Sequence, residues 1–138
     1  ASMENAKSRW QNYILSEEAR PIKLSRSIKT AINYIESAVA KGRKPENIAK
    51  RKAELEEKKK ELIFAEKHIA LLYRLEKEAD RVYHNTKYVS RGSSYNYQYE
   101  TEIEFKLDGK HYQFSPMPSG TTFYHGYGRL IESKDDEA

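Results

Sequence analysis

The chain has 138 residues, of which 33% are charged and 38% hydrophobic, and its formal net charge is +4 at pH 7. This length allows one domain, or one domain with a helical arm, and so polar a composition predicts a thin core that oligomerisation would complete. The chain has no cysteine, which excludes disulfides, thiolate zinc sites and cysteine nucleophiles. The modest positive charge suits an anionic partner such as nucleic acid, a nucleotide or phosphate.

The hydropathy pattern gives no sign of a membrane segment. No apolar run approaches the roughly 18 residues of a membrane-spanning helix, and no signal-peptide pattern opens the chain. We therefore expect a cytoplasmic protein, in the host-cell cytoplasm if it is viral, with no membrane partner.

The N-terminal residues predict a short amphipathic helix. Residues 4–18 place apolar side chains at helical spacing, and the helix is expected to end before Pro21. We treat residues 1–22 as an N-terminal arm and residues 23–138 as a single domain. The only tryptophan, Trp10, lies in the arm, where it is expected to anchor the arm to the body or to a second subunit. A direct ligand contact by Trp10 is the alternative.

Two further helices are predicted to form an antiparallel hairpin. The first begins near Ser25 or Ser27 and ends at Gly42. A longer helix starts at Pro45 and contains no Pro or Gly as far as about His84. The short connection makes the two helices antiparallel neighbours. The apolar stripe of the first helix comprises Ile28, Ala31, Ile32, Ile35, Ala38 and Val39.

The two halves of the long helix differ in character. Lys52 and Lys59 interrupt the apolar repeat, so residues 45–60 are expected only to cover the preceding helix. Residues 62–75 are more apolar and are expected to form the floor under a larger layer. The Glu/Lys run at 54–60 has mixed signs at helical spacing, which predicts an ion-paired, solvated face and not a nucleic-acid patch.

Beyond residue 85 the pattern changes to that of strands. Residues 95–107 alternate between an odd face of tyrosines and apolar side chains and an even, polar face with glutamates at 100, 102 and 104. Asp108-Gly109 predicts a two-residue type I′ hairpin. The predicted cross-strand pairs are Leu107 with Lys110, Phe105 with Tyr112, and Ile103 with Phe114.

The first half of this long strand needs another partner, either residues 87–90 or residues 121–131. The predicted fold class is therefore α+β. It consists of an antiparallel helical hairpin with one long helix, followed by a small antiparallel sheet of three or four strands packed on the C-terminal half of that helix.

The sequence contains no pattern typical of an enzyme. The four histidines share no metal-ligand spacing, and no Gly-x-Ser-x-Gly occurs. The glutamates of the even strand face have no identifiable acid/base partner, and an exposed polar strand face produces such a row by default. We expect no catalytic residue, no metal and no cofactor.

Tyrosine is the more informative residue type. Eight of the eleven tyrosines lie between residues 83 and 127, interleaved with Arg91 and Arg129. Rings that stack on a base beside guanidinium groups that bind phosphate hold nucleotides, although tyrosine is also a good strand former. In segment 123–129 two glycines flank Tyr127, which lets the backbone approach a ligand; glycines at a strand bulge would look the same.

This layout resembles the phage Thoeris anti-defence sponges over roughly residues 24–131. Members of that family are non-catalytic and sequester cyclic ADP-ribose signals, and some also bind cyclic oligonucleotides, in pockets formed as subunits associate. The resemblance implies that Arg74 matches the family's helix arginine, and Tyr97 or Tyr99 its base-stacking aromatic. It implies that His125 and Arg129 match the terminal phosphate-binding pair, with His125 where the family has arginine. A neutral histidine compensates phosphate charge less well.

These observations predict a non-catalytic protein that sequesters a phosphorylated cyclic nucleotide of the cyclic ADP-ribose type and counteracts a host defence pathway. We expect a homodimer or higher homo-oligomer. The alternative is a small phage-type inhibitor or adaptor that binds a protein or nucleic-acid machine through its helical hairpin and sheet, with nucleic acid the less favoured partner. The predicted ligand-binding residues are Arg74, Tyr88, Arg91, Tyr97, Tyr99, His125, Tyr127 and Arg129.

Overall fold

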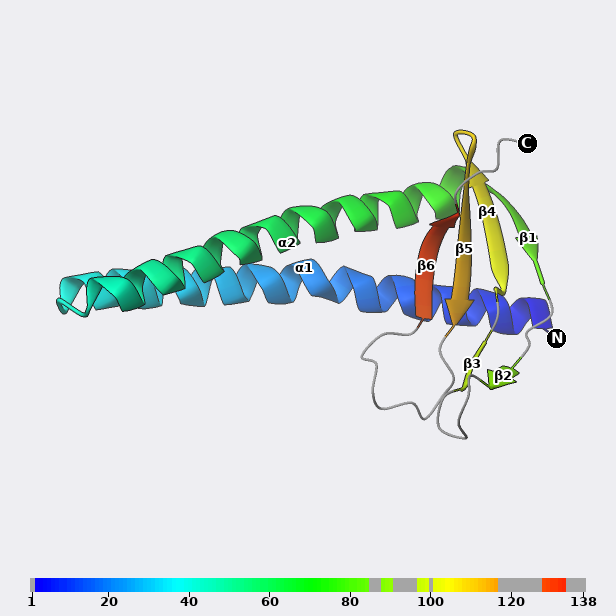
Figure 1. Ribbon diagram of the computed structural model, residues 1–138. Coiled ribbons are helices and arrows are strands. Elements are labelled where there is room, and N and C mark those ends of the chain that lie inside the picture. Colours follow the sequence, from blue (N-terminus) through cyan, green and yellow to red (C-terminus); the bar gives the residue numbers. More distant parts are fainter. Residues whose placement is uncertain (1, 85–87, 91–96, 100, 117–127, 134–138) are drawn as a thin grey trace. The chain divides into compact units, whose positions relative to one another are not determined.

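The computed structural model describes residues 2–84, 88–90, 97–99, 101–116 and 128–133. Within these residues, two helices precede six short strands, and Figure 1 labels each of them. The elements are α1 (Ser2–Ala40), α2 (Pro45–Glu78), β1 (Asp80–Tyr83), β2 (Tyr88–Ser90), β3 (Tyr97–Tyr99), β4 (Ile103–Leu107), β5 (Lys110–Pro116) and β6 (Gly128–Ser133). A helical hairpin followed by an antiparallel sheet confirms the predicted α+β class.

The chain forms two compact units, which we describe separately. Unit 1 comprises residues 1–16 and 71–138, and unit 2 comprises residues 17–70. Within the described residues, neither helix contains a stretch long and apolar enough to cross a membrane.

The first helix corrects one prediction, because α1 does not end before Pro21. It runs without interruption from Ser2 to Ala40, through Pro21 and through the predicted boundary between residues 22 and 23. An internal proline removes one helical hydrogen bond and costs about 3 kcal/mol. Buried residues on both sides of Pro21, such as Trp10 and Ala38, stabilise the helix by packing, which outweighs this local cost.

Unit 2 is the predicted antiparallel helical hairpin. At Gly42 the backbone turns with φ of 67°, and Arg43 N donates to Ala38 O at 3.0 Å, which satisfies a carbonyl at the end of α1. Across the hairpin, Lys58 Nζ donates to Ser27 Oγ at 2.7 Å. The second half of the hairpin therefore covers the first, as predicted.

Only part of the predicted apolar stripe in α1 is buried. Ile35 and Ala38 are buried, as is Leu55 of α2, but Val39 is 55% exposed and Ile32 is 36% exposed. Two helices share a single narrow interface, so a wide stripe leaves its flanks in solvent. The 54–60 run is ion-paired and solvated, as predicted. Its ion pairs are Glu56 with Lys59 and Glu57 with Lys60, and the members of each pair are three residues apart.

Unit 1 contains a four-stranded antiparallel sheet in the order β1-β4-β5-β6. Asp108 and Gly109 both have positive φ, 52° and 77°, and the three predicted cross-strand pairs of β4 and β5 are present. The type I′ hairpin and its register are thus confirmed. The inner face of the sheet buries six side chains, Ile103, Phe105, Leu107, Tyr112, Phe114 and Pro116.

The first turns of α1 supply the layer that covers this inner face. The Trp10 ring lies 4.7 Å from the Phe105 ring and 5.1 Å from the Phe114 ring, measured between centroids, and Trp10 is 1% exposed. The anchoring role predicted for Trp10 is therefore confirmed. From α2, this unit buries Leu72 and Leu75.

The long helix ends earlier than predicted. It stops at Glu78 and not near residue 84, because residues 80–83 form β1, which pairs with β4. Nothing in the local sequence ends a helix here. The pairing with β4 provides backbone partners and an inner face for alternate side chains, and this tertiary context overrides helix propensity.

The predicted strand 95–107 is divided into β3 and β4. Strand β3 pairs with β2, which was one of the two predicted partners, whereas β6 pairs with β5. At the start of β4, Glu102 N donates to Phe114 O at 2.8 Å although Ile103 is the register partner of Phe114. Two residues therefore oppose one, which is a β-bulge. The bulge turns Glu102 inward, where it is 0% exposed, so the prediction of an exposed glutamate at this position is wrong.

Candidate ligand pocket

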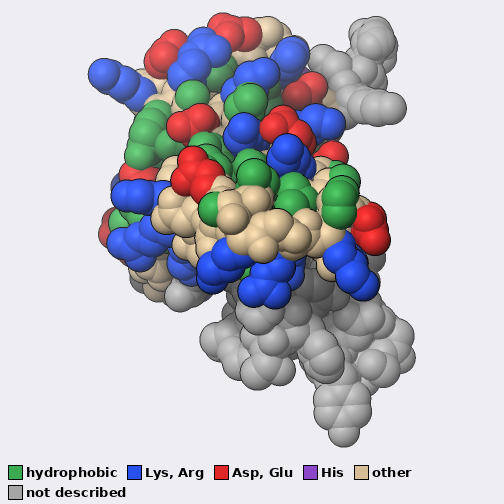
Figure 2. Space-filling model, turned by 90° about the vertical axis from the view of Figure 1, so that its left-hand side faces the viewer, with side chains coloured by type: hydrophobic (Ala, Val, Ile, Leu, Met, Phe, Trp, Pro, Cys, Tyr) green, Lys and Arg blue, Asp and Glu red, His purple; other side chains and the backbone are tan. Residues whose placement is uncertain are grey.

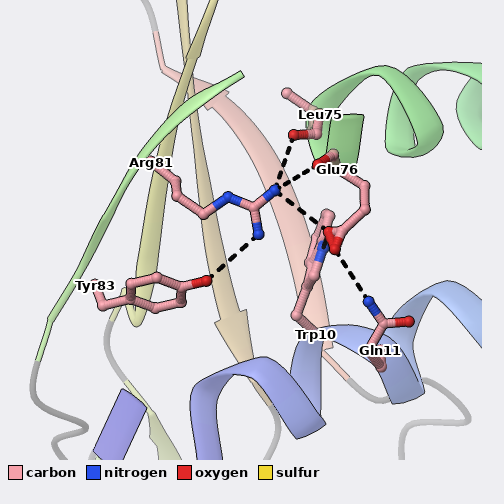
Figure 3. A network of polar contacts seen from close by, with 6 residues as sticks. All are labelled: Trp10, Gln11, Leu75, Glu76, Arg81 and Tyr83. Atoms are coloured by element: carbon pink, nitrogen blue, oxygen red, sulfur yellow. Dashed lines mark hydrogen bonds and ion pairs between the residues drawn. The ribbon is translucent and has the colours of Figure 1, made fainter. Parts of the chain in front are cut away.

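A polar site of unit 1 lies where α1, the end of α2 and β1 meet. A pocket of about 530 Å³ opens there. Figure 3 shows the polar contacts that form its wall. Its lining residues are Met3, Lys7, Trp10, Gln11, Glu76, Arg81 and Tyr83.

Secondary structure explains why these side chains converge. Met3, Lys7 and Trp10 are three or four residues apart on α1 and so share one face of the helix. Arg81 and Tyr83 are two residues apart on β1 and so share one face of the strand. The register of β1 places them opposite Phe105 and Ile103, whose side chains belong to the buried inner face.

Glu76 is the centre of the network. Its Oε2 accepts hydrogen bonds from Trp10 Nε1 at 3.0 Å and from Arg81 Nη2 at 3.3 Å, and its Oε1 accepts one from Gln11 Nε2 at 3.1 Å. Both carboxylate oxygens are therefore engaged, and the carboxylate fixes the position of the indole and of the guanidinium.

Arg81 also completes the end of α2. Its Nη2 donates to Glu76 O at 2.7 Å and to Leu75 O at 3.3 Å, two carbonyls that have no helical partner in the last turn. Its Nη1 donates to the Tyr83 hydroxyl at 3.4 Å, and the guanidinium carbon lies 5.3 Å from the Phe105 ring centroid. Burial alone would lower the pKa of Arg81, but the hydrogen bond to Tyr83 and the attraction of Glu76 outweigh it and raise that pKa.

Two cationic side chains of the pocket, Lys7 and Arg81, have donor groups available for a ligand. Lys7 is exposed and makes no ion pair with any described residue, and Arg81 Nη1 has only the long contact to Tyr83. With Glu76 as the single carboxylate, the pocket has a formal charge of +1. The Tyr83 ring adds an aromatic surface beside these cations. Such a site can bind an anion that carries a planar group.

The described residues include no group of three or more His, Cys, Asp or Glu side chains that could hold a metal ion.

The structure places two of the predicted ligand-binding arginines far apart. Arg74 Nη2 donates to Asp108 Oδ2 at 2.8 Å and to Glu78 Oε1 at 3.4 Å, and these hydrogen bonds, that of Glu78 first, raise its pKa. It thus lies at the turn between β4 and β5. Arg129 pairs with Ser115 near the other end of β5, about 17 Å away along the strand at about 3.3 Å per residue. The turn that holds the Arg74 guanidinium and the strand position of Arg129 therefore lie at opposite ends of β5.

The predicted tyrosines lie at the Arg129 end of the sheet. Tyr88 is opposite Tyr99, and Tyr97 is opposite Ser90, in the two-stranded ribbon of β2 and β3. Strand β3 contacts β5, and the ribbon lies beyond the end of β5 in Figure 1. The remaining predicted site residues, Arg91, His125 and Tyr127, lie outside the described residues.

Gly128 has a structural reason to be glycine. Its φ is 143°, and a Cβ there would lie 2.7 Å from Ser115 O and 2.9 Å from Phe114 Cε1. The close approach of β6 to β5 therefore explains this glycine without a ligand.

Gly128→Ala is expected to destabilise the protein by about 2 kcal/mol, since the methyl group meets backbone atoms that cannot move away and φ is unfavourable for alanine. Urea unfolding followed by tryptophan fluorescence measures this. Gly109→Ala is a useful comparison, because a Cβ at Gly109 meets nothing within 4 Å and only the positive φ opposes it. Equal losses for the two variants would contradict the steric explanation.

Sequence reasoning missed most of this pocket. It weighed Trp10 as a ligand contact but did not single out Lys7, Glu76, Arg81 or Tyr83. The available signals were the shared helix face of Met3, Lys7 and Trp10 and the shared strand face of Arg81 and Tyr83, but the strand itself was predicted as helix. Comparison with protein-family models, curated proteins and solved structures finds no match for this chain.

Proposed function

We propose that the protein is a non-catalytic binding protein that sequesters a phosphorylated cyclic nucleotide signal of the cyclic ADP-ribose type, and so counteracts a host defence pathway. The observation that supports this most is the pocket lined by Lys7, Arg81 and Tyr83. Its volume of about 530 Å³ lies within the roughly 300–1,000 Å³ typical of small-molecule sites.

The chemistry of the pocket suits such a ligand. Lys7 and Arg81 can each donate to phosphate oxygens, and the Tyr83 ring can stack on a base. Glu76 and the carbonyls of α2 already hold the guanidinium, so little conformational entropy is lost when a ligand binds there. The Arg81 guanidinium is thus held in place before a ligand binds, and no acid/base pair has been identified among the lining residues. Both points agree with a protein that binds its ligand and leaves it unchanged.

The exposed apolar side chains agree with the proposed homodimer or higher homo-oligomer. Val82 on β1 and Ile131 on β6 are 56% and 41% exposed, and both strands are edges of the sheet. An edge strand with exposed apolar side chains is a ready partner for another chain.

Titration calorimetry of cyclic ADP-ribose isomers against the intact protein tests the proposal. Lys7→Ala should weaken binding by about tenfold, the effect of losing one charge-assisted hydrogen bond. Lys23→Ala, at another exposed lysine of α1, is the matched control and should bind as the unmodified protein does. The nucleotide should be recovered unchanged by chromatography after incubation.

Three outcomes would change the conclusion. If no isomer gives heat, the proposed function is wrong. If Arg129→Ala abolishes binding and Lys7→Ala does not, the ligand binds at the tyrosine-rich end of the sheet and not in this pocket. If the nucleotide is consumed, the protein is an enzyme.

A further inference from the structure

The connection of the hairpin concentrates positive charge in unit 2. Residues 41–52, which we call the basic tip, contain six cations and one carboxylate, a formal charge of +5. The whole chain carries +4, so all the other residues together carry −1. Figure 2, which views the hairpin from this end, shows Lys and Arg side chains around it. The cations are Lys41, Arg43, Lys44, Lys50, Arg51 and Lys52.

These charges differ from those in the middle of α2. Lys59 and Lys60 pair with glutamates of their own helix. In the basic tip only Arg51 has an ion pair, with Glu54 at 3.5 Å, and the other five cations pair with no described residue. All six are exposed. Unpaired cations gathered on one end are costly to keep together unless an anion binds there.

Two shallow hollows adjoin the basic tip, of about 200 and 260 Å³, and both are lined by Tyr34, Arg51 and Glu54. Tyr34 is 51% exposed, and the Arg51 guanidinium lies 4.9 Å from its ring centroid. Asn47 and Lys50 line the second hollow. An exposed ring beside cations and an amide is the arrangement on which unpaired bases stack while their phosphates are neutralised.

We propose that the basic tip is a binding site for single-stranded nucleic acid, in which the unpaired cations contact phosphates and Tyr34 stacks on a base. This site belongs to unit 2 and is additional to the nucleotide pocket of unit 1. A membrane surface is the less favoured partner, because interfacial binding needs large apolar side chains among the cations, and the basic tip has only the half-buried Ile48.

The first test measures the salt dependence of binding. Fluorescence anisotropy follows the binding of a labelled 20-nucleotide oligothymidylate to the 138-residue chain at 50 and 200 mM KCl. Four or five phosphate contacts predict binding about 50- to 130-fold weaker at the higher salt concentration, from a slope of about 0.7 per contact. Absence of binding at 50 mM KCl overturns the proposal.

The second test separates a local site from net charge. The variant Arg43→Gln/Lys44→Gln/Lys50→Gln should lower the salt slope by about 2, because three phosphate contacts are lost. The control removes the same charge from the middle of the helix, with Lys59→Gln/Lys60→Gln/Lys67→Gln, and should keep slope and affinity. Equal losses in the two variants overturn the proposal.

The third test examines the aromatic contact. Tyr34→Ala should weaken binding of the oligonucleotide by about 5- to 160-fold, the range for loss of one stacked base. Phe64→Ala, at a 64% exposed ring of the same hairpin, should bind normally. Three results would each overturn the proposal. They are an unchanged affinity of Tyr34→Ala for the oligonucleotide, tighter binding of a duplex of equal length, and binding only to phosphatidylserine vesicles. Calorimetry with cyclic nucleotides tests unit 1 independently of these results.

Discussion

Trp10→Ala is expected to lower the free energy of unfolding by about 3–5 kcal/mol, the range for removal of a large aromatic side chain from a core. The indole is 1% exposed, contacts the rings of Phe105, Phe114 and Tyr13, and donates to Glu76. For a chain of this size the loss corresponds to about 10–15 °C in Tm. Thermal unfolding followed by far-ultraviolet circular dichroism measures it.

Leu15→Ala is the matched control for Trp10. It removes an apolar side chain from the same helix, but this leucine is 61% exposed. We expect a change of no more than about 0.5 kcal/mol. If both variants lose the same stability, the start of α1 does not cover the sheet as described.

Arg9→Ala is expected to cost about 3 kcal/mol. Arg9 forms a bidentate ion pair with Glu102, in which Nε donates to Oε1 at 3.0 Å and Nη2 donates to Oε2. The side chain of Glu102 is 0% exposed. Removing the guanidinium takes two hydrogen bonds and a positive charge away from a buried carboxylate, which is more costly than the pair itself is stabilising. Urea unfolding monitored by the fluorescence of Trp10, the next residue, reports on this site directly.

The double variant Arg9→Met/Glu102→Leu distinguishes charge from packing. Because apolar residues of similar size often replace a buried ion pair without loss, it should recover most of the stability that Arg9→Ala loses. Arg26→Ala, at an exposed arginine of the same helix, should be nearly neutral. A double variant less stable than Arg9→Ala would contradict this account.

The parts of the fold that depend on local sequence signals were predictable. Asp108-Gly109 determines both the turn and the register of β4 and β5, since both positions require positive φ. Gly42 and Pro45 likewise mark the hairpin between the helices. In each case the residues that decide the structure are adjacent in the chain.

The parts that depend on distant residues were not predictable from pattern alone. Pro21 indicates a helix end, yet packing on both sides of it holds α1 together. Residues 80–83 form a strand because β4 is available to pair with them. Glu102 belongs to the polar strand face by alternation, and only the bulge opposite Phe114 turns it towards Arg9.

The candidate site shows the same limit. The tyrosines and Arg129 were chosen for their residue types, and the structure gathers the backbones of Tyr88, Tyr97 and Tyr99 at one end of β5. Arg74 was chosen because it resembles the helix arginine of the Thoeris anti-defence sponges, and the structure ties it to Asp108 at the opposite end. The Glu76 network joins residues more than 60 positions apart, a relation that spacing cannot show.

Unit 1 is discontinuous in the sequence, since its first 16 residues pack with the segment that begins at residue 71. On the ribosome, the hairpin of unit 2 has its whole sequence available while β4 and β5 are still to be synthesised. The contacts within the hairpin are local in sequence, so they are expected to form fast. Once the hairpin has formed, the chain between Arg9 and Glu102 behaves as a shorter loop, and bringing these two residues together costs less conformational entropy. During synthesis, Trp10 is therefore expected to stay exposed until β4 and β5, which carry Phe105 and Phe114, have been made.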